Sequence, residues 1–302
     1  MSKLQDVTGF IYTHDPVIIK DNSHYYRFQT GSSIPISISD DLKDWKLIGK
    51  VFSSNPSWTS MEVPGSTDFW APEVVKRNGE WRIYYSVSTF GKNTSSIGLC
   101  TLNFDKNDPT KFFVKDRGSV IHSTPDDNYN CIDPAVICDD DGRDYLVFGS
   151  FWGGINMTLL DCNGMVADKS SLTNIAIRKA EFNPVEGAFI FRHNDYYYLF
   201  ASHDFCCRGT ASTYHIVYGR SKEITGPYID EKGISMTDGG GTTLRDGFSF
   251  KRWAGPGHNS IFSDDDGKIY LVYHAYDRQD DGRSKLMIEE IGFDQDWIVL
   301  DD

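Results

Sequence analysis

The chain has 302 residues, of which 39% are hydrophobic and 24% charged, and its formal net charge is −13. This composition is typical of a globular protein, and the acidic excess without any Lys/Arg block argues against a nucleic-acid partner. No apolar run approaches the roughly 20 residues of a membrane span, so we expect no membrane partner either. The many aromatic and β-branched residues exclude intrinsic disorder.

One strand pattern occurs five times along the chain: a short apolar strand, a polar turn, and an aromatic-rich strand that ends in small residues. In chain order the copies read HDPVIIKDNSHYYRFQTG, WAPEVVKRNGEWRIYYSVS, IDPAVICDDDGRDYLVFGS, VEGAFIFRHNDYYYLFASH and GHNSIFSDDDGKIYLVYHA. The turn centres Asn-Gly and Asp-Gly favour two-residue hairpins, because both central residues need a positive φ. Each unit is expected to supply three or four antiparallel strands, with later strands at 34–39, 96–102, 154–160, 214–221 and 285–291.

The residues that open the five first strands are Asp15, Glu73, Asp133, Glu186 and His258. They lie 58, 60, 53 and 72 positions apart. A small antiparallel sheet repeated at this period predicts a β-propeller, whereas a β-sandwich would not repeat the whole unit five times. We therefore predict an all-β fold in which residues 1–302 form a single domain, a five-bladed β-propeller with first strands opening near residues 15, 73, 133, 186 and 258.

In a propeller the first strand of each blade lines the central axis, so the five ionisable side chains are expected to form a ring. Clustered carboxylates repel one another and perturb their pKa values, which a protein tolerates mainly where chemistry or a metal uses them. Carboxylate pairs without a Ser–His or Cys–His candidate indicate acid/base hydrolysis of a neutral substrate, and glycoside hydrolysis fits well. The apolar context of Glu186 favours the acid role, and His14 is expected to help keep Asp15 ionised.

Six cysteines are present, and none are spaced as C-x-x-C, so a zinc ribbon or a redox pair of that kind is unsupported. We expect all six to be reduced packing residues. Adjacent Cys206 and Cys207 are expected to point to opposite faces of a strand. The N-terminal residues MSKLQDVTGF lack the apolar core of a signal peptide, so we expect either a cytoplasmic protein or one whose leader has been removed.

Five motifs in chain order together resemble glycoside hydrolase family 43. They are HDP at 14–16, WAPE at 70–73, IDPAV at 132–136, VEGAF at 185–189 and GPGHNS at 255–260. Within this family, GSFWGGI at 149–155, SHDFCCRG at 202–209 and GGGT at 239–242 are similar to the endo-1,5-α-L-arabinanase branch. The resemblance covers essentially residues 10–292 and implies hydrolysis of α-1,5-L-arabinofuranosidic bonds in arabinan and arabino-oligosaccharides.

The resemblance also implies an inverting mechanism with three carboxylates. Asp15 matches the general base that activates water, Glu186 the general acid, and Asp133 the carboxylate that orients the acid and keeps its pKa raised. Inversion implies that the base and acid carboxyls lie roughly 6.5–9.5 Å apart. His258 matches a histidine that contacts a central cation, usually calcium, although calcium prefers oxygen ligands. The alternative for His258 is a buried tunnel histidine without a metal.

Substrate contacts are implied at the rims of the blades, where aromatic faces suit the apolar C–H faces of a furanose. The residues that match these contacts are Trp70, Phe90, Gly91, Asn130, Cys131, Ile132, Ser150, Phe151 and Trp152. Packing within a blade is the alternative for any single aromatic residue. Glu73 replaces the commoner Asp of this motif and is expected to support the site from outside at most. His203 and Arg208 either reach the cleft or fix a turn.

Several other functions remain open at this level. Within the same family they are an exo-acting arabinanase, an arabinofuranosidase and a β-xylosidase, which differ from an endo-acting enzyme mainly in the loops around the cleft. A carbohydrate-binding propeller without catalysis is disfavoured because all three carboxylates are present. A fructan-type hydrolase is disfavoured because such chains carry N-D-P, R-D-P and E-C motifs, whereas the corresponding motifs here are H-D-P, I-D-P and V-E-G. We expect a monomer that needs no organic cofactor.

Overall fold

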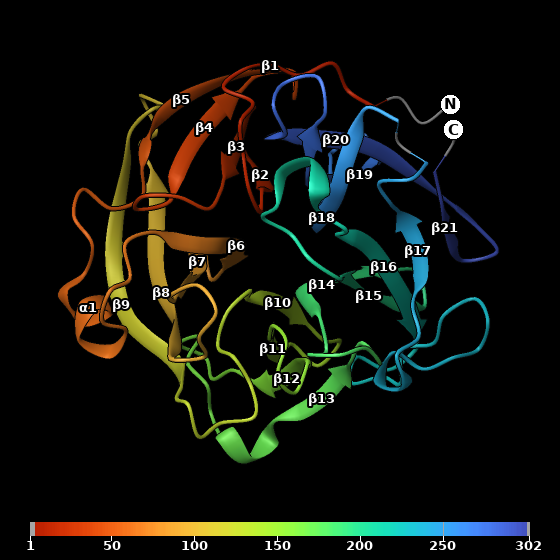
Figure 1. The fold of residues 1–302 in the computed structure, drawn as a ribbon. Coiled ribbons are helices and arrows are strands. Elements are labelled where there is room, and N and C mark those ends of the chain that lie inside the picture. Colours follow the sequence, from red (N-terminus) through yellow and green to blue (C-terminus); the bar gives the residue numbers. More distant parts are fainter. Residues whose placement is uncertain (1–3, 250, 301–302) are drawn as a thin grey trace.

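The computed structural model describes residues 4–249 and 251–300, and it arranges them as five sheets around a central axis (Figure 1). The predicted all-β, five-bladed propeller is therefore confirmed. Within the described residues the one α-helix is α1 (Ser57–Glu62), and no helix there has the length and apolarity to cross a membrane.

The first blade contains β1 (Thr8–Gly9), β2 (Val17–Asp21), β3 (His24–Phe28), β4 (Pro35–Ser39) and β5 (Asp44–Lys50), in the order β1-β5-β4-β3-β2. The second blade contains β6 (Phe69–Arg77), β7 (Glu80–Val87), β8 (Ser95–Phe104) and β9 (Phe112–Ser123). The third contains β10 (Ala135–Cys138), β11 (Asp144–Phe148), β12 (Ile155–Leu159) and β13 (Thr173–Ala176), with the short 3-10 helix η1 (Lys169–Ser171) before β13.

The fourth blade contains β14 (Val185–His193), β15 (Tyr196–His203), β16 (His215–Ser221) and β17 (Thr242–Arg245), with the 3-10 helices η2 (Gly209–Ala211) and η3 (Met236–Asp238) in its connections. The fifth contains β18 (Trp253–Ser263), β19 (Ile269–Asp277), β20 (Arg283–Asp294) and β21 (Trp297–Val299). Neighbouring strands within these two blades are antiparallel. The predicted two-residue hairpin between β6 and β7 is present, with φ of 52° at Asn78 and 82° at Gly79. The prediction is wrong for the two Asp-Gly turns, where positive φ is confined to Gly142 and Gly267 and a longer loop joins the strands.

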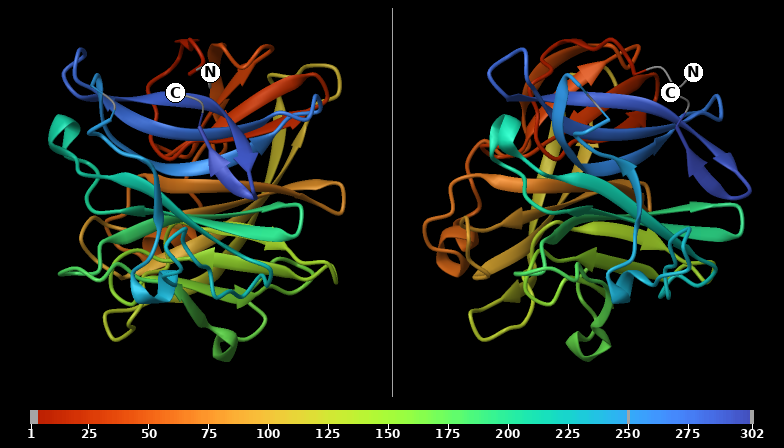
Figure 2. Two further views of the ribbon diagram at one scale, coloured as in Figure 1. Left: turned by 90° about the vertical axis from the view of Figure 1, so that its right-hand side faces the viewer. Right: turned by 45° about the vertical axis from the view of Figure 1, so that its right-hand side comes forward.

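The ring of blades closes between the first and the last sheet, which lie side by side in Figure 2. The segment before β2 runs along β20, where Leu286 donates its N–H to the carbonyl of Ile11 at 2.9 Å. An ion pair of 2.6 Å joins Lys20 at the end of β2 to Asp264 after β18. These contacts fix the first blade against the fifth, and the first strand of each therefore faces the same axial space.

Five hydrophobic clusters hold the blades together, one at each interface between neighbouring sheets. For example, Tyr84 and Leu99 of the second blade pack with Leu146 and Phe148 of the third. Because the apolar side chains are buried between the sheets, the axis itself is left to polar residues. The functional site therefore lies on this axis.

Candidate active site

Each first strand has a residue in a left-handed conformation next to the axis, which lies just before β2 and β10 and at a register shift within β6, β14 and β18. The residues are Asp15, Ala71, Asp133, Gly187 and His258, with φ of 50°, 45°, 59°, 61° and 51°. Positive φ is uncommon for residues other than glycine, and such residues cluster at functional sites. Three of the five carry ionisable side chains into the axial space.

The backbone at these left-handed residues is fixed by a hydrogen bond to a side chain of the preceding blade. The backbone N–H groups of Ala71, Asp133 and His258 donate to Thr30 Oγ1, Ser86 Oγ and Ser202 Oγ at 2.7, 2.8 and 2.8 Å. At the closure of the ring, the N–H of Asp15 donates to His274 Nδ1 at 3.2 Å. The acceptor in each case lies near the end of the second strand of the preceding blade.

The prediction that Glu73 belongs to this ring is wrong. Ala71 holds the equivalent position, because it aligns with Asp15 and Asp133 in the motifs and makes the same inter-blade hydrogen bond. Glu73 lies two residues further along β6, where its exposed fraction is 4%. Burial raises the pKa of Glu73 to about 8, so this carboxyl is mostly protonated at neutral pH.

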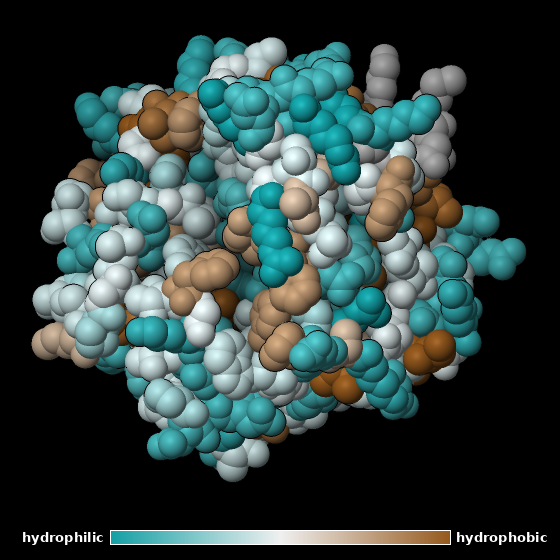
Figure 3. All heavy atoms as spheres, in the orientation of Figure 1, coloured by the Kyte–Doolittle hydropathy of each residue, from teal (hydrophilic) through white to brown (hydrophobic). Residues whose placement is uncertain are grey.

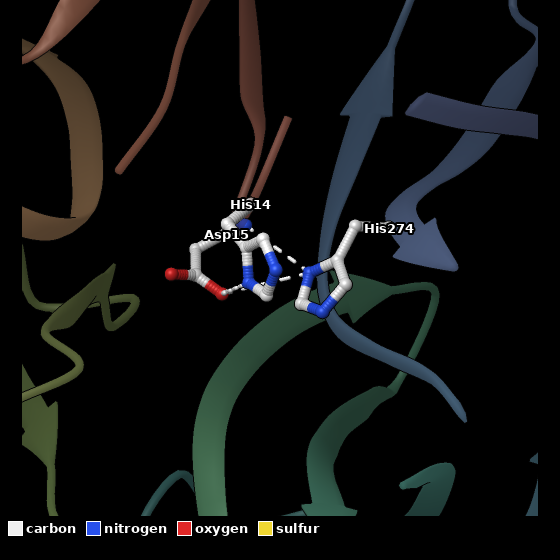
Figure 4. Close-up of side chains that lie close together, drawn as sticks. All are labelled: His14, Asp15 and His274. Carbon is white, nitrogen blue, oxygen red and sulfur yellow. Dashed lines mark hydrogen bonds and ion pairs between the residues drawn. The ribbon is translucent and has the colours of Figure 1, made fainter. Parts of the chain in front are cut away.

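Asp15 is held by three kinds of contact. Its Oδ1 lies 3.2 Å from His258 Nδ1, and its Oδ2 accepts a hydrogen bond from Thr30 Oγ1. Its Oδ1 also lies 3.5 Å from His274 Nδ1, the contact that Figure 4 shows. The predicted help from His14 is weaker, since His14 Nδ1 lies 4.0 Å from Oδ1. Burial alone would raise the pKa of Asp15, but the histidines, His258 first, and the Thr30 hydrogen bond lower it to about 2. Asp15 is therefore ionised at every pH near neutrality.

His274 was not predicted as a site residue, and the structure brings it directly against Asp15. Burial holds the pKa of His274 well below 6.5, so the ring is neutral and its Nδ1 is free to accept the Asp15 N–H. The repeat could have identified His274, because it lies near the end of the second strand of the fifth copy, at the position that Thr30, Ser86 and Ser202 occupy in other copies. All four side chains accept a backbone N–H of the next blade.

Asp133 and Glu186 meet at the junction between the third and fourth blades. Glu186 Oε2 accepts a hydrogen bond from Ser150 Oγ at 2.7 Å, and Asp133 Oδ2 accepts one from the backbone N–H of Gly187 at 3.1 Å. Burial first, and the charges of Glu186 and Asp15 after it, raise the pKa of Asp133 to about 7 despite the opposing effect of His258.

His258 is surrounded by these carboxylates. Burial opposes its protonation, but Asp15, Asp133 and Glu186 together raise the pKa of His258 above 6.5, which favours the imidazolium. Its Nδ1 faces Asp15, whereas its Nε2 has no hydrogen-bond partner among residues 4–249 and 251–300.

These side chains line a cavity of about 720 Å³ on the axis, visible as a hollow near the centre of Figure 3. The cavity brings together most of the predicted site: Asp15, Trp70, Phe90, Gly91, Asn130, Ile132, Asp133, Ser150, Phe151, Trp152, Glu186 and His258. Phe90 and Trp152 are 80% and 37% exposed, so these rings are available to a ligand rather than committed to blade packing.

The prediction for Cys131 is not supported. Its side chain is fully buried in the hydrophobic cluster between the second and third blades, and it does not line the cavity. His203 is also buried outside the cavity, whereas Arg208 lines it. Lining residues that were not predicted include Thr30, Lys92, Phe182, Phe205 and Tyr214. Phe182, which is 70% exposed, lies in a connection between blades with no repeat to mark it.

The six cysteines are free thiols, as expected, but not all of them are packing residues, since Cys162 and Cys207 are exposed. The prediction that Cys206 and Cys207 point to opposite faces of a strand is wrong. They lie in the loop after β15, and a φ of 64° at Cys207 breaks the alternation of an extended chain. Their Sγ atoms lie 2.7 Å apart, and both residues line the cavity.

An ionised carboxylate and a hydroxyl-bonded carboxyl therefore share one cavity on the axis of a five-bladed propeller. This fold and site define a glycoside hydrolase. The model of the glycosyl hydrolases family 43 matches residues 8–298, and the chain belongs to that family. The resemblance based on the five motifs is thereby confirmed.

Two curated relatives are similar over most of their length. The chain is 43% identical over 289 residues to an extracellular endo-α-(1→5)-L-arabinanase of Bacillus subtilis, covering 94% of this chain and 86% of the relative. It is 42% identical over 303 residues to an extracellular exo-α-(1→5)-L-arabinofuranosidase of Cellvibrio japonicus, covering 96% and 86%.

Solved structures agree with this assignment. An endo-arabinanase of family 43 from Bacillus licheniformis superposes with a TM-score of 0.89 at 43% identity, covering 98% of this chain and 99% of that one. An α-L-arabinanase of Cellvibrio cellulosa in complex with arabinohexaose superposes with a TM-score of 0.90 at 39% identity, covering 96% and 95%.

Proposed function

We propose that this protein hydrolyses α-1,5-L-arabinofuranosidic bonds within arabinan and arabino-oligosaccharides. The observation that carries the proposal is that Asp15, ionised, and Glu186, hydrogen-bonded to Ser150, line one cavity with exposed aromatic rings at its edge. The endo-arabinanase of Bacillus subtilis and the arabinohexaose complex of the Cellvibrio enzyme support arabinan as the substrate.

In the mechanism that we propose, Asp15 is the general base. Its low pKa keeps it ionised, and a water held on its carboxylate would lose a proton to it while attacking the anomeric carbon. Glu186 is the general acid that protonates the leaving oxygen. Asp133 positions the acid, because it binds the backbone N–H of the next residue, Gly187. One displacement then inverts the anomeric configuration.

Endo cleavage needs a site that binds sugars on both sides of the broken bond. The exposed aromatic rings at the cavity come from different loops: Phe90 from the loop after β7, Trp152 from the loop after β11, and Phe182 from the connection before β14. Aromatic faces on several sides of one cavity favour contacts with more than one sugar ring. The exo-acting relative of Cellvibrio japonicus is almost equally similar, so exo cleavage is the competing function.

Product analysis on linear debranched arabinan tests the proposal. A ladder of arabino-oligosaccharides at early times is the expected result, with the new reducing ends observed first as the β-anomer by proton NMR. Arabinose or a single short oligomer from the first minutes onward would instead assign exo cleavage. An initial α-anomer would contradict the inverting mechanism, and no hydrolysis of arabinan, aryl arabinofuranoside or xylan would leave a carbohydrate-binding protein.

We also propose that a cation, calcium, binds beside His258. The three carboxylates around His258 raise its pKa and so attract positive charge, and a cation bound at Nε2 would take the place of the proton that the imidazolium carries there. Calcium prefers six to eight oxygen ligands, so His258 would supply one contact and water most of the others. A bound cation would add positive charge to the site.

The neighbouring cluster of His14, Asp15 and His274 fits a metal less well. Its potential ligand atoms lie within 4.8 Å of one another, but the Nδ1 lone pair of His274 already accepts the N–H of Asp15. Elemental analysis of the purified protein tests the calcium proposal, together with thermal unfolding before and after chelator treatment. About one calcium per chain and a lower midpoint after chelation are expected, and a metal-free protein with an unchanged midpoint would overturn it.

A further inference from the structure

Two adjacent thiols on the wall of the catalytic cavity take no part in the proposed hydrolysis. Cys206 is partly buried and Cys207 is exposed, and both line the same cavity as Asp15 and Glu186. The hydrogen bond with Cys207 and burial raise the pKa of the Cys206 thiol, and the charges of Glu186 and Asp15 raise it further. The pair therefore lies close to the reacting groups.

The loop that carries the two cysteines is held in place from several sides. The N–H of Cys207 donates to Tyr276 Oη at 2.8 Å, and the N–H of Arg208 donates to Ser212 Oγ at 3.0 Å. On the other side, the Arg208 guanidinium lies 4.3 Å from the centre of the Phe205 ring. These contacts fix the backbone of the loop, and in this conformation the two Sγ atoms lie 2.7 Å apart.

We propose that Cys206 and Cys207 form a reversible disulfide between neighbouring residues, and that its redox state sets the affinity of the cavity for substrate. The exposed Cys207 thiolate attacks a small-molecule disulfide and releases one small thiol. The Cys206 sulfur then attacks the Cys207 sulfur of the mixed disulfide, and the Cys206 thiol gives its proton to the departing sulfur, which leaves as the second small thiol. Both protons and both electrons of the protein thiols end on the two small thiols.

The geometry predicts that this bond is easily reduced. Consecutive Cα atoms lie about 3.8 Å apart, below the roughly 4.4–6.8 Å of ordinary disulfides, and a strained disulfide is more reducible. Oxidation replaces two rotatable thiols, which can donate hydrogen bonds, by one rigid and less polar surface. A sugar ring packs on such a surface without having to order the side chains, so we expect the oxidised form to bind substrate more tightly.

The first test is chemical and does not depend on the proposed function. The full chain is equilibrated in mixtures of oxidised and reduced glutathione, unfolded, alkylated and digested. The mass of the peptide with residues 206–207 is then measured by mass spectrometry. The expected peptide is unalkylated, is lighter than the dithiol form by two hydrogens, and carries no glutathione. Alkylation of both thiols in every mixture, or mixed disulfides with glutathione alone, would overturn the proposal.

A second probe identifies the reduced pair. Phenylarsine oxide bridges two close thiols, forming two As–S bonds and releasing one water, so one equivalent is expected to bind the reduced protein and none the oxidised one. Cys207→Ser is expected to abolish this binding. Cys162→Ser changes an exposed cysteine that does not line the cavity, and it is expected to bind as the wild type does. Equal binding by both variants would contradict the assignment to Cys206 and Cys207.

The functional test rests on the arabinan activity proposed above. A KM for linear arabinan about threefold or more lower in the disulfide form, with kcat less affected, is expected from one or two immobilised side chains. Cys207→Ser should lose this redox response, and Cys162→Ser should keep it. If the disulfide forms but KM does not change, the link to affinity is wrong. If the chain does not cleave arabinan at all, the mass measurement still decides on the disulfide.

Discussion

The carboxylate of Asp133 accepts the backbone N–H of Gly187 at 3.1 Å, and it therefore holds the start of β14, the strand that carries Glu186. At the other junctions an uncharged Ser, Thr or His side chain accepts the corresponding N–H. At the same junction as Asp133, Ser150, two residues after β11, donates its hydroxyl to Glu186. The one junction at which a carboxylate is the acceptor is therefore the junction that carries the proposed general acid, Glu186.

Glu186→Gln is expected to lower kcat on arabinan by roughly 10²–10⁴-fold, because general acid catalysis contributes about this factor. The loss should be much smaller on aryl arabinofuranosides with good leaving groups, which need little protonation. Steady-state kinetics on both substrates check this. Glu181→Gln, an exposed change outside the cavity, should behave as the wild type, and an equal loss on both substrates would argue against the acid role.

Ser150→Ala is expected to reduce kcat by roughly 10–100-fold, since its hydroxyl stabilises the negative charge that Glu186 gains on giving up its proton, and a hydrogen bond to a charged group contributes about 1.5–3 kcal/mol. The fold should survive, because the change removes one hydroxyl from a buried side chain. Kinetics with circular dichroism of the same sample measure both effects, and Ser60→Ala on exposed α1 is the matched control. Unchanged kcat would mean that Ser150 does not position Glu186.

His274→Ala is expected to lower kcat, because it removes the acceptor for the Asp15 N–H and leaves a void in a fully buried position. His274→Asn places an amide oxygen near the site of Nδ1 and should recover part of kcat. Comparing the two variants at temperatures below their unfolding midpoints separates positioning from stability. If both variants lose kcat only in proportion to their unfolded fraction, His274 is structural alone.

Glu73→Gln is expected to change how stability depends on pH. The folded pKa of about 8 lies above the unfolded value of 4.5, so the folded state holds a proton that the unfolded state releases between these values. Stability from this group is complete below pH 4.5 and is lost as pH rises to 8, by at most about 1.4 kcal/mol per pH unit.

Glutamine keeps an acceptor and cannot ionise, so the variant should gain stability over the wild type as pH rises. Urea unfolding at pH 5, 6.5 and 8 measures the difference, with exposed Glu80→Gln as the control. Parallel curves for the wild type and Glu73→Gln would show that this carboxyl is not protonated in the folded protein.

Phe90→Ala is expected to raise KM for arabinan about 3–10-fold and to leave kcat and the unfolding midpoint nearly unchanged. The ring is 80% exposed at the cavity, so it contributes little to packing but offers a face to a sugar. Phe113→Ala removes a ring that is 68% exposed away from the cavity and should have no effect. Equal KM values for both variants would remove Phe90 from the binding site.

Repetition in the sequence made much of this structure predictable. Five copies of one strand pattern predict five blades, because a small sheet with two apolar faces is stable only between similar neighbours. The copies also place Asp15, Asp133 and Glu186 at the starts of first strands, which all face the axis. Glu73 was misplaced because the alignment followed charge, although the WAP motif itself aligns Ala71 with Asp15.

The tertiary structure decided the contacts that are not local in the sequence. His274 lies 259 residues from Asp15 and reaches it only when the fifth blade closes against the first. The meeting of Cys206 with Cys207 depends on a left-handed residue in a loop, and the exposure of Phe182 depends on the path of a connection between blades. The number of blades and the identity of the three carboxylates can therefore be read from the repeated pattern, because each copy buries the same positions and turns the same position toward the axis. Only the closed ring determined their partners and charges, because burial and hydrogen bonding across blades set the pKa of each group.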